Sequence, residues 1–218
     1  MNLLFDYDGT LHDCARIYCP AFRSVDAGLT ALGMVPAKAR TDEEITRWLG
    51  YGAREMWQQY APQLSEAERE KGSAAIGASM LKSVREGRAA LYPHTEETLD
   101  AMKKAGHTLL FLSNCKTAYL EAHREHFHLD RWFSGFFCTE QFGWQPKTAV
   151  FPAIRERFPG EYVVIGDRFH DMAIAEAYVL KAVGCLYGYG SVEELRVATV
   201  LISGIEELVG AVERLSQA

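Results

Sequence analysis

The sequence is poor in the features that mark several large classes of protein. Its 218 residues include only five cysteines, with no CxxC pair and no close Cys/His cluster of the kind that binds zinc. They are Cys14, Cys19, Cys115, Cys138 and Cys185. We therefore expect reduced, mostly buried thiols and no disulfide framework.

Long apolar runs and an excess of basic charge are also missing. No apolar stretch reaches the roughly 20 residues that a transmembrane helix needs, and the N-terminus lacks the basic segment of a signal peptide. Lysine and arginine number 23 against 29 aspartates and glutamates, and the net charge of −6 disfavours general attraction to nucleic acid or an anionic membrane. We expect a cytoplasmic protein that binds neither.

A long helical stretch follows the first apolar run. The composition, 48% hydrophobic and 24% charged, is that of an ordinary globular protein. Residues 17–91 contain helix-like segments, the first of them at 17–34, without any strand-like interruption. Two capping-box patterns, Thr41 with Glu44 and Ser65 with Glu68, predict helix starts within this stretch.

The remainder of the chain alternates between strand-like and helix-like segments. The first strand is expected at 2–6, and later ones at 107–112, 135–139, 161–167, 181–186 and 199–203. Helices are expected at 95–104, from 117 onward, and at 149–158, 169–179 and 204–215. Apolar strands alternating with helices predict an α/β fold, a Rossmann-like parallel sheet with helices on both faces.

Polar side chains gather where these strands end. They are Asp6, Asp8, Ser113, Asn114, Asp167 and Asp171. Ligands of open parallel sheets bind beyond the carboxyl ends of the strands, and neighbouring carboxylates repel each other unless a cation lies between them. Oxygen ligands rich in aspartate suit Mg²⁺ better than zinc. The pattern therefore predicts a magnesium site at this edge of the sheet.

Four ordered motifs resemble those of the haloacid dehalogenase-like hydrolase superfamily. They are DYDGTL at 6–11, LSN at 112–114, a lysine at 147 and GDRFHD at 166–171. LYGYGSVEEL at 186–195 resembles the tail of the phosphoglycolate phosphatase-like branch. The resemblance covers essentially the whole chain. It implies a catalytic core at 1–14 and 92–218, and a small α-helical cap at 15–91.

The resemblance also implies an activity, a Mg²⁺-dependent phosphatase acting on a small phosphorylated metabolite through an aspartyl-phosphate. Asp6 would be the nucleophile, since a carboxylate needs charge neutralisation but no base to attack phosphorus. Asp8 would protonate the leaving alcohol and then activate water. Ser113 would hold a phosphate oxygen, with Gly9 and Asn114 also binding substrate.

The implied metal ligands are Asp6, the backbone carbonyl of Asp8, and Asp167. Asp171 would help directly or through water. Capping of the helix that follows Asp167 is an alternative role for these last two carboxylates, and the two roles are compatible.

The cation between nucleophile and phosphate is the least regular part of the resemblance. Many relatives carry this lysine in a Lys-Pro-x-Pro pattern, and here an ungapped match would place Gln145 at its position. Lys147 lies just beyond, at the predicted helix start, and we assign the catalytic and substrate-binding role to it. The alternatives are Lys116 and Arg168.

Two further assignments concern the cap and the histidines. The stretch GYGAR at 50–54 corresponds to a cap loop that touches substrate in this branch, so Gly50 and Arg54 are candidate substrate contacts. We interpret His123, His126 and His128 as the polar end of a helix.

Other functions remain open from sequence alone. A phosphomutase of the β-phosphoglucomutase kind would use the same core. A metal-free 2-haloacid dehalogenase or a receiver-like signalling module is less compatible with Asp8, and the helical insert also argues against the receiver. A non-catalytic binder of phosphorylated ligands is a further alternative. The substrate (phosphoglycolate, pyrophosphate, a nucleotide or a sugar phosphate) and the oligomeric state are not determined by the sequence.

Overall fold

The computed structural model describes residues 1–217, which form two compact units. One unit comprises Met1–Asp13 together with the chain from Leu91 onward, and the other is Cys14–Ala90. All five cysteines are buried, as expected from their scattered spacing. Within residues 1–217, none of the helices combines the length and the apolar character needed to cross a membrane.

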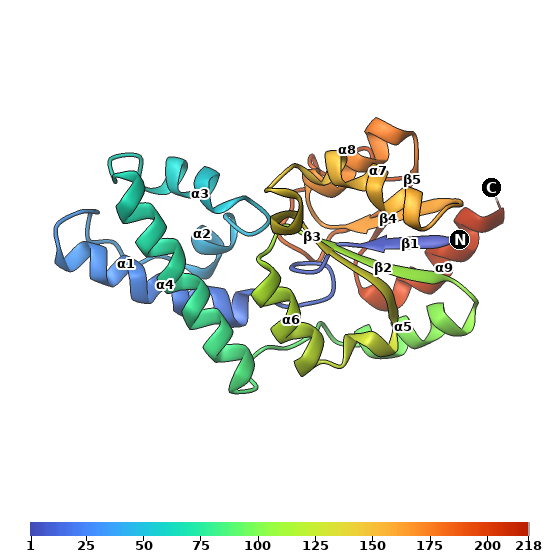
Figure 1. The fold of residues 1–218 in the computed structure, drawn as a ribbon, viewed down its shortest axis with the longest axis horizontal. Coiled ribbons are helices and arrows are strands. Elements are labelled where there is room, and N and C mark those ends of the chain that lie inside the picture. Colours follow the sequence, from blue (N-terminus) through green and yellow to red (C-terminus); the bar gives the residue numbers. More distant parts are fainter. Residues whose placement is uncertain (218) are drawn as a thin grey trace. The chain divides into compact units, whose positions relative to one another are not determined.

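The first unit is built on a six-stranded sheet in which every neighbouring pair of strands is parallel (Figure 1). The strands are β1 (Asn2–Phe5), β2 (Thr108–Ser113), β3 (Phe133–Cys138), β4 (Tyr162–Gly166), β5 (Lys181–Cys185) and β6 (Val200–Ile202). Their order is β3-β2-β1-β4-β5-β6, so the first strand of the chain lies inside the sheet between β2 and β4. The predicted parallel sheet is confirmed, with β3 beginning two residues before the expected 135.

Helices cover both faces of this sheet (Figure 1). They are α5 (Thr95–Lys104), α6 (Thr117–His126), α7 (Lys147–Arg157), α8 (Phe169–Tyr178) and α9 (Leu208–Gln217). The helix expected at 204–215 differs, because Ile205–Glu207 form a separate 3₁₀ turn before α9 begins.

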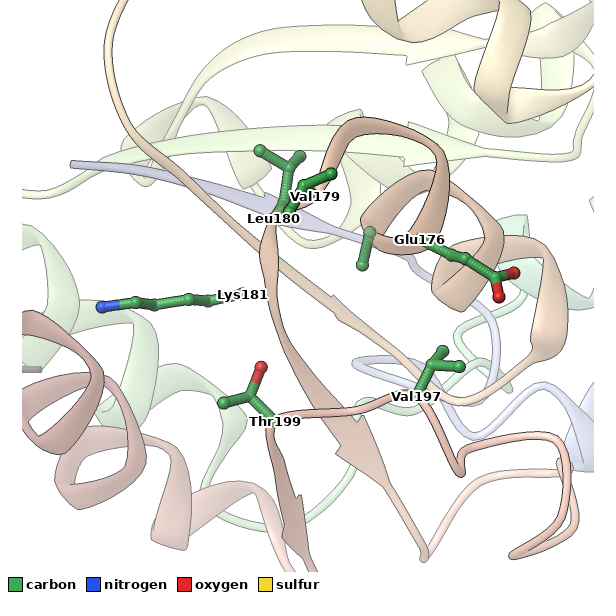
Figure 2. Close-up of a pocket in the computed structure, with 7 residues that line it drawn as sticks. Glu176, Val179, Leu180, Lys181, Val197 and Thr199 are labelled. Carbon is green, nitrogen blue, oxygen red and sulfur yellow. The ribbon is translucent and has the colours of Figure 1, made fainter.

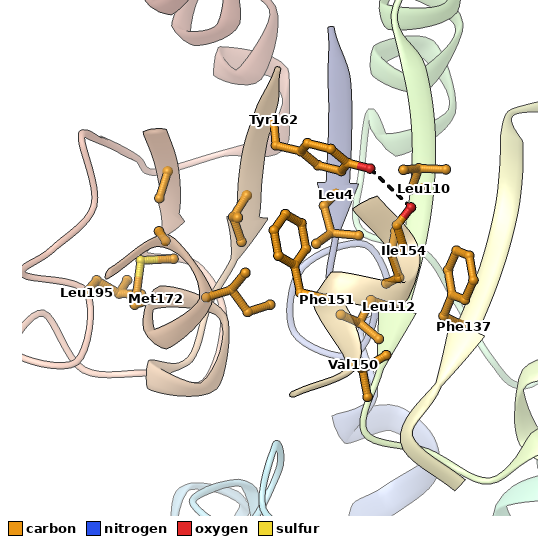
Figure 3. Close-up of a cluster of buried hydrophobic side chains, with 14 residues drawn as sticks. Leu4, Leu110, Leu112, Phe137, Val150, Phe151, Ile154, Tyr162, Met172 and Leu195 are labelled. Carbon is orange, nitrogen blue, oxygen red and sulfur yellow. Dashed lines mark hydrogen bonds between the residues drawn. The ribbon is translucent and has the colours of Figure 1, made fainter. Parts of the chain in front are cut away.

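A cluster of apolar side chains fixes the sheet against α7 and α8. Figure 3 shows Leu4, Leu110, Leu112 and Phe137 from the strands, Val150, Phe151 and Ile154 from α7, and Met172 from α8. Tyr162 is also buried here, and its hydroxyl donates to the carbonyl oxygen of Phe158 at 2.5 Å. Burial of each large apolar side chain contributes about 1.5–3 kcal/mol, so the strands, and with them the positions of their ends, are firmly held.

The second unit is helical throughout its regular structure. It contains α1 (Ala15–Ala31), α2 (Asp42–Thr46), α3 (Ala53–Tyr60) and α4 (Glu66–Arg85). Both predicted capping boxes are confirmed: the side chain of Thr41 accepts from the backbone N–H of Glu44 at 3.2 Å, and that of Ser65 from Glu68 at 3.4 Å. α1 ends at Ala31, before the expected residue 34, because the chain turns through Gly33 with φ +68°.

Candidate active site

Three buried carboxylates meet at the carboxyl ends of β1 and β4. Asp6 directly follows β1, and its backbone N–H donates to the carbonyl oxygen of Ile165 in β4 at 2.9 Å. Asp167 follows β4, and Asp171 lies in the first turn of α8. Carboxylate oxygens of the three aspartates lie within 4.8 Å of one another, and none of the residues is more than 7% exposed.

Lys147 supplies a cation to this cluster. It is the first residue of α7 and is 4% exposed. Its Nζ donates to Oδ1 of Asp6 at 2.6 Å and to Oδ1 of Asp171 at 2.7 Å. The predicted proximity of Lys147 to Asp6 is therefore present, whereas its catalytic role stays a prediction.

The two alternative cations are placed differently. Lys116 is exposed at the N-terminus of α6. Arg168 is buried, and its Nε donates to Glu194 at 2.8 Å. Of these candidates, Lys147 is the one that we place in the cluster, because its ammonium donates to two of the three carboxylates.

The cluster carries more negative than positive charge, and this shifts its proton equilibria. Burial and the neighbouring Asp171 raise the pKa of Asp6 well above its usual range, although Lys147 opposes the shift. Burial, with a contribution from Asp171, raises the pKa of Asp167 to about 7. Burial alone would lower the pKa of Lys147, but the two carboxylates beside it raise that pKa. The clustered oxygen donors and their unbalanced charge fit a hard divalent cation.

The turn after β1 holds Asp167 in place. Gly9 has φ +92°, and a Cβ at this position would lie 2.3 Å from Oδ2 of Asp167, so only glycine fits. The hydroxyl of Thr10 donates to Oδ1 of Asp167 at 3.1 Å, and the backbone N–H of Tyr189 donates to Oδ2 at 2.7 Å. Tyr189 belongs to the segment 186–195 singled out in the sequence. Both oxygens of Asp167 are therefore oriented by the protein.

Asp171 combines helix capping with a place in the cluster. Its Oδ2 accepts from the backbone N–H of Arg168 at 3.2 Å, while Lys147 donates to its Oδ1. The carboxylate also lies close to the backbone, since a Cβ at Gly166 would be 2.3 Å from its Cγ. The predicted capping role is confirmed, whereas metal binding by Asp171 stays a prediction.

The side chain of Asp8 points to a different set of partners. Its Oδ1 accepts from Nδ1 of His12 at 2.7 Å and from the hydroxyl of Tyr119 at 2.8 Å. Burial alone would raise the pKa of Asp8, but the hydrogen bond and positive potential of His12, with help from Tyr119, lower it. The side chain of Asp8 lies outside the cluster formed by Asp6, Asp167 and Asp171. Metal binding by the backbone carbonyl of Asp8 stays a prediction.

The interpretation of His123 as part of a polar helix end is wrong. His123 is fully buried, its Nδ1 lies 2.8 Å from the hydroxyl of Tyr7, and burial lowers its pKa to about 3. His126 and His128 are exposed, as expected. The spacing of four between Tyr119 and His123 places both on one face of α6, and this signal in the sequence points to a shared environment.

The remaining predicted residues occupy two regions. Ser113 is buried at the end of β2, the strand next to β1, and Asn114 follows it half-buried. Gly50 and Arg54 belong to the helical unit, where Arg54 is exposed in the first turn of α3. Their contacts with substrate stay predictions.

A cavity of about 370 Å³ lies at the other edge of the sheet (Figure 2). It is lined by Glu176 and Val179 near the end of α8, by Lys181 at the start of β5, and by Val197 and Thr199 ahead of β6. Because all the strands run in the same direction, these amino ends are opposite the carboxylate cluster. We expect the chemistry at the buried carboxylates, which carry reactive groups, and not at this hollow.

The fold and the cluster together define an α/β protein with an acidic site beyond the ends of its parallel strands. Residues 1–178 match the family model of haloacid dehalogenase-like hydrolases. The chain therefore belongs to the haloacid dehalogenase-like hydrolase family, as its four motifs indicated.

The sequence identity between this chain and individual relatives is low. The chain is 27% identical to a phosphoglycolate phosphatase of Agrobacterium fabrum over 87% of its own length and 82% of the relative's. It is 28% identical to a 5'-nucleotidase of Pseudomonas aeruginosa, covering 89% of this chain and 86% of that one. The crystal structure of a predicted phosphatase from Clostridium acetobutylicum superposes with a TM-score of 0.80 at 23% identity, covering 98% of both chains. This last similarity shows the shared fold.

Proposed function

We propose that this chain is a Mg²⁺-dependent phosphatase that hydrolyses small phosphate monoesters through an aspartyl-phosphate on Asp6. The observation that carries the proposal is the contact of Lys147 with Asp6, at 2.6 Å, inside a cluster of three buried carboxylates. An anionic nucleophile must approach an anionic phosphate, and this arrangement provides the nucleophile with the charge that offsets their repulsion.

In the first step, a carboxylate oxygen of Asp6 attacks the phosphorus atom. The bond from phosphorus to the ester oxygen breaks. Asp8, which takes up a proton when the negatively charged phosphate binds beside it, gives this proton to the ester oxygen so that a neutral alcohol leaves. Lys147 stabilises the negative charge that Asp6 and the phosphate share. Ser113 and Asn114, together with Gly9, would hold the non-bridging oxygens of the phosphoryl group as it is transferred.

In the second step, the oxygen of a water molecule attacks the phosphorus of the aspartyl-phosphate. Asp8, now ionised, accepts a proton from this water, and the bond between Asp6 and phosphorus breaks. Inorganic phosphate leaves, Asp6 is again a carboxylate and Asp8 is again protonated. The sum of both steps is the hydrolysis of one ester by one water.

The metal would be held by Asp6, the backbone carbonyl of Asp8 and Asp167, with Asp171 acting directly or through a water molecule. Mg²⁺ bound there supplies positive charge beside the phosphate and reduces the repulsion within the cluster. The raised pKa values of Asp6 and Asp167 support this assignment, because burial and the neighbouring Asp171 make their negative charges unfavourable until a cation binds.

Two relatives with different names support the proposed substrate class. Phosphoglycolate and 5'-nucleotides are both phosphate monoesters, and we propose 2-phosphoglycolate as the first ester to test. We further propose that residues 15–91 act as a cap on the core formed by 1–14 and 92–218. Gly50 and Arg54 would then contribute to substrate selection from the cap.

A phosphate-release assay with and without Mg²⁺ tests the proposal. The panel contains 2-phosphoglycolate, 5'-nucleotides, sugar phosphates and p-nitrophenyl phosphate, and Asp6→Asn is the matched variant. We expect release from at least one ester with Mg²⁺ and none from folded Asp6→Asn. Undiminished turnover in EDTA, with the metal content verified as absent, would exclude the metal assignment.

A further inference from the structure

The carboxylate of Asp8 is anchored through one of its two oxygens. His12 Nδ1 and the Tyr119 hydroxyl both donate to Oδ1, at 2.7 and 2.8 Å. No hydrogen bond within residues 1–217 ends on Oδ2. The side chain of Asp8 is 19% exposed, whereas that of His12 is 0% exposed. One oxygen is therefore fixed from the protein side, and the other is available for chemistry.

The protonation of His12 follows from this geometry. A carboxylate oxygen has no proton to give, so Nδ1 of His12 carries the proton and donates it. Nε2 of His12 is buried without a hydrogen-bond partner among the described residues. Nδ1 is therefore the ring atom that contacts Asp8, and Nε2 takes no part in the contact.

The local backbone fixes where His12 can point. Its backbone N–H donates to the carbonyl oxygen of Tyr7 at 3.0 Å, and its own carbonyl accepts from Gly9 at 3.0 Å. Its ring stacks on that of Tyr7, with centroids 5.2 Å apart and planes 9° apart. The turn that carries Asp8 therefore also carries one of its anchors.

α6 holds the second anchor and supports the first. The rings of His12 and His123 have centroids 4.5 Å apart, and those of Tyr119 and His123 are 4.2 Å apart. Tyr7 and His123 are joined by a 2.8 Å hydrogen bond. Because these rings pack against one another, neither donor to Asp8 can rotate without displacing its neighbours.

We propose that His12 and Tyr119 are positioning residues for the proton transfers of Asp8. This inference rests on the proposed function, which gives Asp8 the acid and base roles. The two donors hold Oδ1, so that Oδ2 gives its proton to the ester oxygen and later takes one from water. Neither His12 nor Tyr119 gains or loses a proton in these steps.

The test compares two aryl esters of similar shape with the Mg²⁺-loaded enzyme. p-Nitrophenolate is a good leaving group without a proton, whereas departure of phenolate depends more on protonation by Asp8. The value of kcat/KM reports the step that forms the aspartyl-phosphate. We expect His12→Ala and Tyr119→Phe to lower kcat/KM for phenyl phosphate by about 10-fold or more. For p-nitrophenyl phosphate we expect a loss of less than about 3-fold.

Three further variants separate positioning from general damage. His12→Asn keeps a donor near the place of Nδ1 and should restore part of the phenyl phosphate activity. Tyr7→Phe breaks the bond to His123 in the same cluster without touching Asp8. It should lower the unfolding temperature but leave the ratio of the two kcat/KM values unchanged. His12→Ala should add little once Asp8→Asn is present, since it acts through Asp8.

Equal losses for both esters in His12→Ala and Tyr119→Phe would overturn the proposal and assign these residues a structural role only. The proposal would also be overturned if His12→Ala caused its full loss of kcat/KM in the Asp8→Asn background. If His12→Ala does not fold, the ratios of the two kcat/KM values in Tyr119→Phe and His12→Asn still decide between a positioning role and a structural role. Failure of the proposed function is recognised separately, because Asp8→Asn itself would then leave the ratio of the two esters unchanged.

Discussion

Nζ of Lys147 lies 2.6 Å from Oδ1 of Asp6, although 141 residues separate them in the sequence. The parallel sheet creates this contact. β1 delivers Asp6 to its carboxyl edge, and α7 begins with Lys147 at the same edge. A buried ammonium and a buried carboxylate at this distance depend on each other, because each would be an uncompensated charge without its partner.

Replacement of Lys147 tests the importance of this contact. We expect Lys147→Ala to lower kcat/KM by about 100-fold or more, a loss typical of removing one group that stabilises charge in the transition state. Lys116→Ala is the matched control, since Lys116 is exposed and should change activity little. Circular dichroism and steady-state kinetics on both purified variants provide the measurement.

Lys147→Arg should restore activity only in part. The broad guanidinium fork cannot replace a compact ammonium between two carboxylates in a buried site. If Lys147→Ala kept normal activity while Lys116→Ala lost it, the cation would have been assigned to the wrong lysine.

Gly9→Ala should damage the metal site specifically. The new methyl group would meet Oδ2 of Asp167 at 2.3 Å, and the φ of +92° adds strain of about 1–2 kcal/mol. Gly106→Ala carries similar strain at φ +84°, with nothing within 4 Å of the added Cβ. We expect both variants to be less stable, but only Gly9→Ala to lose Mg²⁺-dependent activity. Normal activity in Gly9→Ala would show that Asp167 can move without consequence.

Asp167→Asn should raise the Mg²⁺ concentration for half-maximal activity more than Asp171→Asn. Asp167 is assigned as a direct ligand and accepts hydrogen bonds from neutral donors, Thr10 and the backbone N–H of Tyr189. Asp171 instead accepts from the charged ammonium of Lys147 and caps α8 through the backbone N–H of Arg168. Loss of a partner outside the direct ligands commonly costs about 10- to 100-fold in metal affinity. Asp130→Asn, at the surface, serves as the control in the same Mg²⁺ titration. The reverse order of Asp167 and Asp171 would contradict the ligand assignment.

The stabilisation of the fold by Mg²⁺ should increase with pH. Asp167 has a pKa of about 7 in the folded protein, raised from the usual value of about 3.9. Between these values the folded state binds more protons than the unfolded state, so the metal-free protein loses stability as pH rises. Mg²⁺ must displace that proton, and its effect on Tm should therefore be larger at about pH 7.5 than at about pH 5.5. An equal effect at both pH values in a thermal-shift assay would contradict this.

Much of the fold was predictable because its signals are local. Alternating apolar strands and helices indicated the parallel sheet, and the capping boxes at Thr41 and Ser65 marked helix starts that the structure contains. Boundaries were less predictable where a turn interrupts a helical pattern. Gly33 ends α1 early, and a 3₁₀ turn precedes α9.

The candidate site was predictable where chemistry-bearing residues follow strands. Asp6 and Asp167 were identified in this way, and the structure brings them together with Asp171. The partners of Asp8 were not predictable. His12 and Tyr119 approach Asp8 from a turn and a helix whose contacts depend on tertiary packing. His123 was misinterpreted for the same reason: a histidine near a helix end carries no sign of the rings that bury it.

The most direct test of the account is to identify the residue that becomes phosphorylated. Asp8→Asn should form the aspartyl-phosphate from p-nitrophenyl phosphate and hydrolyse it slowly, so acid quenching and peptide mass spectrometry can locate the phosphoryl group. We predict one phosphoryl group on Asp6, and none when Asp6→Asn is combined with Asp8→Asn. A phosphoryl group on any other residue, or its retention in the double variant, would contradict the account.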